Sequence, residues 1–308
     1  MTLGDVSSIF SRYFVVGFFL PAFFGLVTLW QTLSPDFPPD RLRYGDAGDV
    51  AVLGGIALLV GLLLTGMRQT VSNYLRGYTG FASVWLTLPL YSLLLRRQLR
   101  VFLRLQMRIE EGDEAAIVLA DRYFPDEVAD LRPTRFGNAY EALELYAYSR
   151  YGLDRLVWPR IRALLSDREL EQHTDLRTDL AMFVNFSLVA CAMAVPYFID
   201  WVHYRGLSEK GLALWLGALA VSYGFLRLAT SALAHWGDEV RVSVDINRRV
   251  LYEKLGLIDP KDDYEERELA SALSQLIAYG RPLPEHLRCP RKCDDGPGDV
   301  SGRTEAKA

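Results

Sequence analysis

Residues 78–108, YTGFASVWLTLPLYSLLLRRQLRVFLRLQMR, set the arrangement of the rest of the chain. The stretch begins as an apolar run and passes directly into arginines. Four of these recur at every fourth residue and so share one face of an α-helix, a membrane-surface basic stripe made of Arg96, Arg100, Arg104 and Arg108. A basic helix with an apolar back lies on a bilayer because its apolar side is buried and its arginines attract anionic headgroups. Arginines beside a bilayer also mark its cytoplasmic side.

Composition places the chain between a soluble protein and a wholly embedded one. Half of its 308 residues are hydrophobic, yet 23% are charged. This balance fits if roughly a third of the chain crosses lipid, at about 20 residues per crossing. The net charge of -4 provides no general basic field. We therefore expect no nucleic-acid partner.

A first transmembrane hairpin is predicted in residues 1–77. Residues 13–33 carry no charge and are long enough to cross a bilayer, and a second apolar segment follows at 50–67. A signal peptide is the rival interpretation of the first segment, but the apolar run is too long and no A-x-A-like site follows. The loop between the segments is rich in proline and aspartate, which suits the outer face.

The segment 78–95 leaves two topologies open. If it crossed the bilayer, the arginines after it would face away from Arg68 and Arg76, against the positive-inside bias. The favoured interpretation is therefore an interfacial or re-entrant segment. The alternative is a true span, which gives five crossings.

Residues 78–179 are predicted to form the basic helix and a cytoplasmic helical unit. Charged residues, turns and prolines punctuate this segment, with a short helix at 115–123. Asn138 and Glu141, three residues apart, match a capping box and predict a helix start at Asn138. Gly152 is suited to end that helix.

A second transmembrane hairpin is predicted in residues 180–235, with spans at 180–198 and 211–234. The fourth span contains small residues at steps of four, three and four. Small residues on one face allow another helix to approach closely. They form a helix-packing stripe of Ala213, Gly217, Ala220 and Gly224.

Residues 236–280 are predicted to be cytoplasmic helices. A seven-residue apolar spacing continues beyond the fourth span through Val244 and Leu251, which predicts packing on a partner helix or on a second copy. A further helix is expected at 263–279, since its start is acidic and Gly280 follows it. Residues 281–308, rich in proline, glycine and charge, are predicted to be disordered.

Arg227 and Asn185 form the candidate intramembrane polar site. Arg227 is a cation inside an apolar span, and it either pairs with an acid such as Asp179 or Asp238 or extends to the nearby membrane surface. Asn185 and Ser187 in the third span favour hydrogen bonds between helices over ion coordination.

No catalytic, cofactor or metal site is predicted. His286, Cys289 and Cys293 lie close in sequence, as do Asp200 and His203, but neither group supplies the four ligands of a structural zinc site. Phosphate loops, nucleophile elbows, zinc-protease helices and dinucleotide fingerprints are absent from the sequence. With no catalytic signature, the chain is not expected to be an enzyme.

Three short motifs carry a resemblance. PTRFGN (133–138), RYGLD (150–154) and WPR (158–160), followed by WGDEVRVSVDINRRVLYEKLGL (236–257), resemble a set of uncharacterised bacterial multi-pass membrane proteins. The resemblance covers roughly residues 132–257. It implies a membrane location and the unity of this segment, and it implies no activity or site residue.

The sequence thus predicts an all-α, polytopic bacterial inner-membrane protein with four transmembrane helices in two hairpins and both termini in the cytoplasm. The expected function is a non-catalytic oligomeric scaffold or effector that binds a protein partner through its cytoplasmic helices. Anionic lipid headgroups and further copies of the chain are the other expected partners. The alternative is an ion channel or small-solute transporter, with a polar path near the third and fourth spans. The scaffold is favoured because pathways normally need more intramembrane polar residues.

Overall fold

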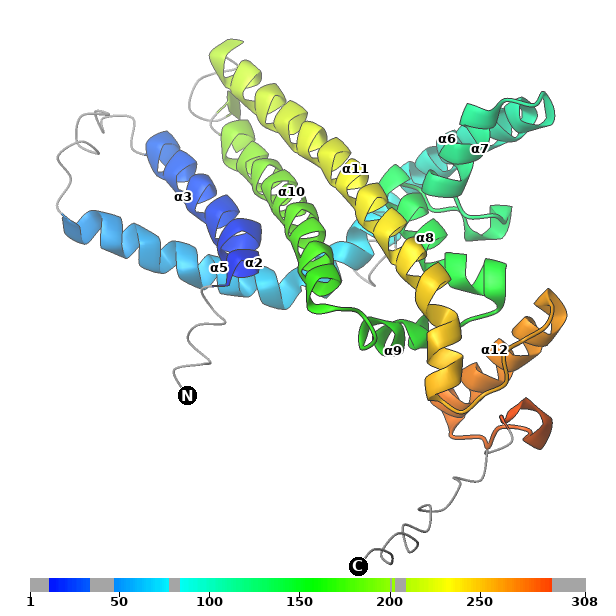
Figure 1. Cartoon of the computed structure of the whole chain (residues 1–308). Helices are drawn as coiled ribbons and strands as arrows, with labels where there is room; N and C mark the ends of the chain where they lie inside the picture. The colour runs from blue at the N-terminus through cyan, green and yellow to red at the C-terminus, as the bar shows by residue number, and fades with distance from the viewer. Residues whose placement is uncertain (1–10, 34–46, 78–83, 200, 203–208, 290–308) are drawn as a thin grey trace, which may run out of the picture. The chain divides into compact units, whose positions relative to one another are not determined.

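The computed structural model describes residues 11–33, 47–77, 84–199, 201–202 and 209–289 (Figure 1). These residues form helices and turns, and the only strand-like pairing among them is an isolated bridge between Leu257 and Arg288. The prediction of an all-α chain is confirmed. In chain order the helices are α2 (Arg12–Phe14), the π-helical turn η1 (Val15–Phe19), α3 (Leu20–Leu33), α5 (Ala47–Arg76), α6 (Val84–Glu110), α7 (Glu114–Tyr123), η2 (Val128–Asp130), α8 (Arg135–Tyr151), η3 (Arg155–Val157), α9 (Trp158–Arg162), α10 (Asp167–Ile199), α11 (Glu209–Lys254), α12 (Asp263–Tyr279) and η5 (Glu285–Leu287).

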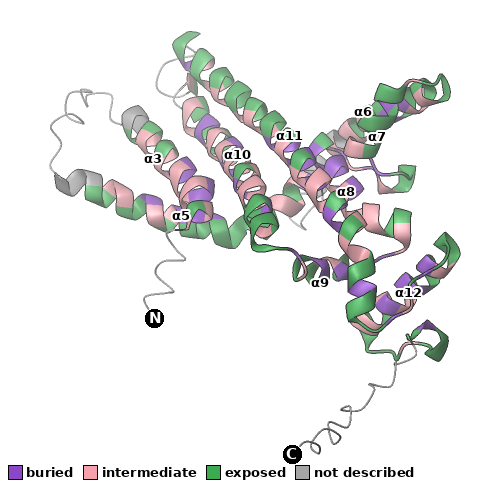
Figure 2. Cartoon of the chain, viewed as in Figure 1, coloured by how far each residue is buried: buried purple, intermediate pink, exposed green. Residues whose placement is uncertain are grey.

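Four helical segments among the described residues are long and apolar enough to cross a membrane, as predicted. They are Arg12–Trp30, Ala51–Arg76, Asp167–Ile199 and Glu209–Lys254. Figure 2 shows exposed residues along α5 and α11, and these include large apolar side chains such as Leu59 and Tyr223. Such apolar surface requires lipid or another chain to cover it. Helix α6 is not among the four, and the ambiguous residues 78–83 lie outside the described part.

The first and third candidate spans pack closely. Gly17, Pro21 and Gly25 are four residues apart and share one face, which meets α10. A methyl group added at Gly17 would touch the Cβ of Ala181 at 3.4 Å, and one added at Gly25 would overlap Cγ1 of Val189. Small residues therefore let the two backbones approach each other.

The α6–α7 hairpin changes the expected role of the residues behind the basic stripe. Phe102 and Leu105 of α6 are buried against Ala116, Phe124 and Leu131, and Leu95 and Leu99 pack on the same cluster. This apolar side was expected to enter the lipid boundary. Because these residues are buried in protein, the hairpin has a core of its own, and the exposed side of α6 carries the arginines together with apolar side chains such as Leu103.

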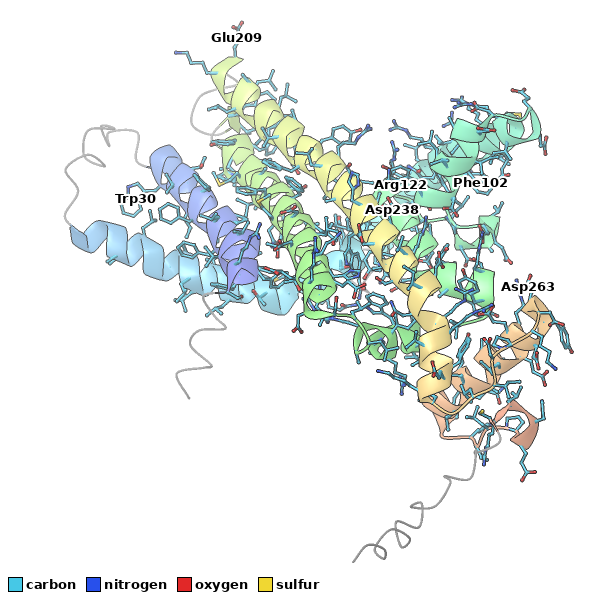
Figure 3. The ribbon with its side chains drawn as sticks, viewed as in Figure 1. Trp30, Phe102, Arg122, Glu209, Asp238 and Asp263 are labelled. Carbon is cyan, nitrogen blue, oxygen red and sulfur yellow. The ribbon has the colours of Figure 1, made fainter. Side chains whose placement is uncertain are left out.

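Two ion pairs attach α7 to α11. Arg122 pairs with Asp238, as Figure 3 illustrates, and Nη1 of Arg241 lies 2.8 Å from a carboxylate oxygen of Asp121. The side chain of Arg241 is only 10% exposed, so its charge depends on this partner. Asp238, which the sequence offered as a partner for Arg227, is bound to Arg122 instead.

The predicted capping box at the start of α8 is wrong. The helix begins at Arg135, three residues earlier, and the hydroxyl of Thr134 accepts a 2.8 Å hydrogen bond from the backbone N–H of Gly137. Asn138 is buried inside the helix, where its side-chain oxygen accepts from the backbone N–H of Arg132. Glu141 pairs with the Arg132 guanidinium at 3.0 Å. The two residues that resembled caps therefore bind Arg132, in the loop before the helix, instead of capping the first turn.

The chain divides into two compact units, residues 1–146 with 166–242 and residues 147–165 with 243–308. The boundary falls inside α8 and again inside α11, so the predicted segment 78–179 contributes to both units. In the second unit Leu153, Val157 and Ile161 pack against the seam residues Val244 and Leu251 and against α12. The partner of the seam thus comes from the same chain.

The end of the second unit is more ordered than expected. Helix α12 spans Asp263–Tyr279, as predicted, with Asp262 as its N-cap and Gly280 in the left-handed region at φ 66°. Beyond it, Leu287 is fully buried and its carbonyl accepts from the N–H of Ile258 at 3.1 Å. The prediction of disorder is therefore wrong for residues 281–289, and residues 290–308 lie outside the described part.

The tight contact between α3 and α10 leads to the first prediction. Gly25→Ala should destabilise the detergent-solubilised protein by about 1–3 kcal/mol, because the added methyl group overpacks against the β-branched Val189. Gly54→Ala is the matched control, since a methyl group there meets nothing within 4 Å. Thermal unfolding measures both variants. Equal shifts in melting temperature for the two variants would contradict the close contact between Gly25 and Val189.

Candidate functional site

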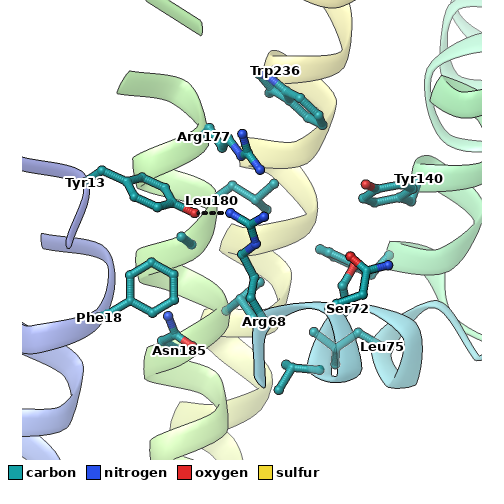
Figure 4. A pocket seen from close by; sticks show the side chains of 15 residues that line it. Tyr13, Phe18, Arg68, Ser72, Leu75, Tyr140, Arg177, Leu180, Asn185 and Trp236 are labelled. Carbon is teal, nitrogen blue, oxygen red and sulfur yellow. Dashed lines mark hydrogen bonds between the residues drawn. The ribbon is translucent and has the colours of Figure 1, made fainter. Parts of the chain in front are cut away.

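A pocket of about 130 Å³ in the first unit is lined by residues from all four candidate spans (Figure 4). Tyr13 comes from α2, Arg68 from α5, Arg177 and Asn185 from α10, and Trp236 from α11. Helix α8 contributes Phe136 and Tyr140. None of the residues that line the pocket is acidic.

Two arginines give the pocket its positive charge. Nη1 of Arg68 donates a 3.0 Å hydrogen bond to the hydroxyl of Tyr13, and the guanidinium of Arg177 lies 6.0 Å from the centre of the same ring (Figure 4). Within the described part of the chain, no carboxylate forms an ion pair with either arginine. The pocket is therefore suited to a small anion, which two guanidinium groups would bind by charge-assisted hydrogen bonds.

Tyr140 lines the pocket on the α8 side, and Arg76 packs on its ring. The guanidinium carbon of Arg76 lies 3.8 Å from the Tyr140 ring centre, and Arg76 also pairs with Glu144 one turn further along α8. Burial raises the pKa of Tyr140 above its usual value, while Arg76 acts in the opposite direction. The phenol is therefore protonated at neutral pH and keeps its hydrogen to donate.

Asn185 connects the first and third candidate spans. Its side-chain N–H donates a 2.7 Å hydrogen bond to the carbonyl of Gly17, and the residue is 4% exposed. Pro21, four residues after Gly17, has no N–H, so the carbonyl of Gly17 lacks the donor that an α-helix normally supplies. Asn185 supplies a donor from the neighbouring helix. This agrees with the expected interhelical role.

A reciprocal pair of serines connects α10 to α11. The hydroxyl of Ser187 donates to the carbonyl of Ser222, and the hydroxyl of Ser222 donates to the carbonyl of Ser187, both at 2.9 Å. Both hydroxyl groups are thereby satisfied by protein. The face of α11 that carries Ser222 is thus the face turned toward α10.

Arg227 lies away from Asn185. It is exposed, and its Nη1 is 3.5 Å from the hydroxyl of Tyr223, one turn earlier on α11. It lines a second cavity, between α6, α7, α8 and α11, whereas Asn185 lines the first. The two residues that the sequence grouped as one polar site are therefore separated in the structure.

The small-residue stripe on α11 is open. Ala213, Gly217, Ala220 and Gly224 are all exposed, and a methyl group added at either glycine would meet nothing within 4 Å. At about 100° per residue these positions lie on the face opposite Ser222. Hence the stripe points away from α10 and contacts no helix in the described part of the chain.

The basic stripe on α6 is exposed along its length, at Arg96, Arg100, Arg104 and Arg108. Its last member differs from the others. Arg108 bonds to Asp113 at 2.6 Å and 2.9 Å, and this hydrogen bond, together with those from the first turn of α7, lowers the pKa of Asp113. Asp113 therefore neutralises the charge of Arg108 but not that of Arg96, Arg100 or Arg104.

The residues considered as metal ligands do not assemble in the described part of the chain. No group of three or more ligand-type side chains occurs there. His286 lies 3.2 Å from a carboxylate oxygen of Glu268, and Cys289 is exposed. Asp200, His203 and Cys293 lie outside the described residues.

The pocket of Arg68 and Arg177 was not found from the sequence. Arg68 directly follows the second predicted span, and Arg177 precedes the third by three residues, so both resembled ordinary charges at span ends. The sequence did indicate that both arginines lie at the same predicted membrane surface. The sequence did not show that their side chains converge.

Comparisons with protein families, with curated proteins and with solved structures find no match for this chain. The class that the fold and the site define is an all-α chain with four helices able to cross a membrane and an arginine-lined pocket where they meet. The resemblance to uncharacterised bacterial membrane proteins stays a prediction.

The hydrogen bond of Asn185 leads to a prediction of coupling with Pro21. Asn185→Leu should destabilise the protein by about 1 kcal/mol, because the carbonyl of Gly17 loses its donor. In a Pro21→Ala background this cost should shrink, since residue 21 regains the N–H that Gly17 needs. A double-mutant cycle of thermal stability measures the coupling. Strictly additive effects would show that the bond does not compensate for the proline.

Proposed function

We propose that the protein is a non-catalytic, oligomeric scaffold or effector of the bacterial inner membrane. Its four candidate spans anchor it, its copies associate through α11, and its helices on the cytoplasmic side bind a protein partner. The arginines that follow the second span and α6 support placing these helices, and both termini, in the cytoplasm.

The observation that carries this proposal is the uncovered stripe on α11. Only 6% of the apolar window of this helix is buried, the smallest share among the four candidate spans. Small residues line the face that points away from α10, and Gly217 and Gly224 have open space beside them. In lipid such a face favours close helix association, because packing between helices drives association there.

Exposed side chains in the second unit support a protein partner. Tyr264 and Tyr279 of α12 are 80% and 76% exposed, and Leu255, just after α11, is 43% exposed. Tyrosine is enriched at protein interfaces because a large ring combines apolar contact area with a polar hydroxyl. These residues are the first candidates for alanine substitution once a partner has been identified.

Oligomerisation through the stripe is tested by cysteine cross-linking in membranes. In a variant with its three native cysteines changed to serine, Ala220→Cys should give a disulfide-linked dimer. Leu219→Cys is the matched control, because it is also exposed but is turned by about 100° from residue 220. Adding Gly217→Leu and Gly224→Leu should abolish the Ala220→Cys dimer.

The substitutions separate association from folding. A Cβ added at residue 217 or 224 meets no atom within 4 Å, and both positions are exposed, so the leucine variants should retain the melting temperature of the monomer. Equal cross-linking at residues 219 and 220, or an unchanged dimer in the leucine variants, would contradict the proposed interface.

The alternative function, an ion channel or small-solute transporter, is favoured by one observation. The pocket of Arg68 and Arg177 receives residues from all four candidate spans and has no acidic lining residue. A site where spans converge on uncompensated positive charge is suited to an anion.

Flux in reconstituted vesicles distinguishes the two functions. If the pocket is part of a pathway, the wild type should carry chloride or phosphate, and Arg68→Gln and Arg177→Gln should each reduce the flux at least several-fold through loss of a positive charge. Arg104→Gln is the control, because it removes the same charge from an exposed arginine outside the pocket. Flux no greater than that of empty vesicles would leave the scaffold as the function.

A further inference from the structure

A second cavity of the first unit combines an apolar groove with positive charge. It has a volume of about 490 Å³ and lies between α6, α7, α8 and α11. Leu94 and Val101 of α6, Leu119 of α7 and Leu226 of α11 contribute apolar wall. A groove of this size is in the range of small-molecule sites, roughly 300–1,000 Å³.

Three arginines line the same groove: Arg97 of α6, Arg135 of α8 and Arg227 of α11. No acidic residue lines it, and within the described ranges no carboxylate forms an ion pair with any of the three. Arg135 is held in place, with its guanidinium 4.5 Å from the ring centre of Tyr123. The groove therefore has positive charge that the described chain does not neutralise.

The position of the groove indicates the kind of anion. Tyr223 and Arg227 belong to the fourth candidate span, whereas Arg97 belongs to the arginine-rich part of α6. One ligand in the groove thus meets guanidinium groups and the apolar side chains of a span together. An acyl chain joined to an anionic phosphate satisfies both requirements, whereas a free inorganic anion would leave the apolar wall uncovered.

The two cavities differ in size. The pocket of Arg68 and Arg177 has about 130 Å³. The larger groove has almost four times this volume and is the one that Arg227 lines. The first cavity therefore has room only for a small anion, whereas the second has room for an amphipathic one.

We propose that the groove binds one anionic phospholipid per chain. Arg97, Arg135 and Arg227 bind its phosphate and headgroup, and an acyl chain lies along Leu94, Val101 and Leu226. The proposal rests on the membrane location in the proposed function and adds a specific lipid site to it. The site is distinct from the exposed stripe of α6, because Arg96, Arg100, Arg104 and Arg108 do not line the groove.

Adjacent arginines of α6 provide a matched test. Arg96 and Arg97 are both exposed and follow one another on the helix, but only Arg97 lines the groove. Titration of the full chain in an uncharged detergent with phosphatidylglycerol, followed by native mass spectrometry, should show one tightly bound lipid. Phosphatidylcholine should bind at least tenfold more weakly, since it carries no net charge.

Arg97→Gln and Arg227→Gln should each weaken the first phosphatidylglycerol site about fivefold, and the double variant about 25-fold. Arg96→Gln and Arg104→Gln should change the affinity less than twofold. Melting temperatures monitor the folding of each variant. Leu226→Ala tests the apolar wall without altering charge, and it should weaken phosphatidylglycerol binding several-fold.

Three results would overturn the proposal. These are equal binding of phosphatidylglycerol and phosphatidylcholine, equal losses for Arg96→Gln and Arg97→Gln, or competition by inorganic phosphate at the same concentration as the lipid. Cross-linking through Ala220→Cys reports on the scaffold separately. Lost lipid selectivity with intact cross-linking rejects the groove alone, and lost cross-linking with intact lipid binding rejects the α11 interface alone.

Discussion

In a membrane-embedded chain, every backbone polar group must form its hydrogen bond within the protein. The contact between the first candidate span and α10 meets this requirement at one carbonyl. Pro21 removes one donor from the first candidate span, and the amide of Asn185 replaces it at the carbonyl of Gly17. The bond joins the same two helical segments as the close contacts of Gly17 and Gly25. One polar side chain thus adds a directional contact to an apolar interface.

The distribution of paired and unpaired arginines follows from the packing of α7 and α8. Acidic residues neutralise the arginines that hold helices together, as in the pairs Arg122–Asp238 and Arg241–Asp121. The arginines of the two cavities have no such partners among the described residues. All of these arginines have the same side chain. The presence of a facing carboxylate therefore distinguishes the structural arginines from the candidate ligand-binding ones.

The two proposed surfaces of α11 adjoin along one edge of the helix. Ser222 faces α10, the small-residue stripe lies opposite, and Tyr223 and Arg227 line the groove. At about 100° per residue, Tyr223 lies between Ser222 and the stripe, whereas Arg227, seven residues after Ala220, lies within about 20° of it and borders the stripe. Self-association and lipid binding therefore adjoin at Arg227, and variants of Arg97 and Leu226, which lie off the stripe, test the groove separately.

Elements with local signals could be predicted from the amino-acid sequence. Apolar length marked the four candidate spans, and an acidic start followed by Gly280 marked α12, because helix ends are set by interactions within a few residues. Contacts between distant segments set the partner of Asn185, the convergence of Arg68 with Arg177, and the burial of Phe102 against α7. The physical reason is separation along the chain: Asn185 and its acceptor are 168 residues apart. No local periodicity encodes which of several chemically equivalent donors will reach a given carbonyl.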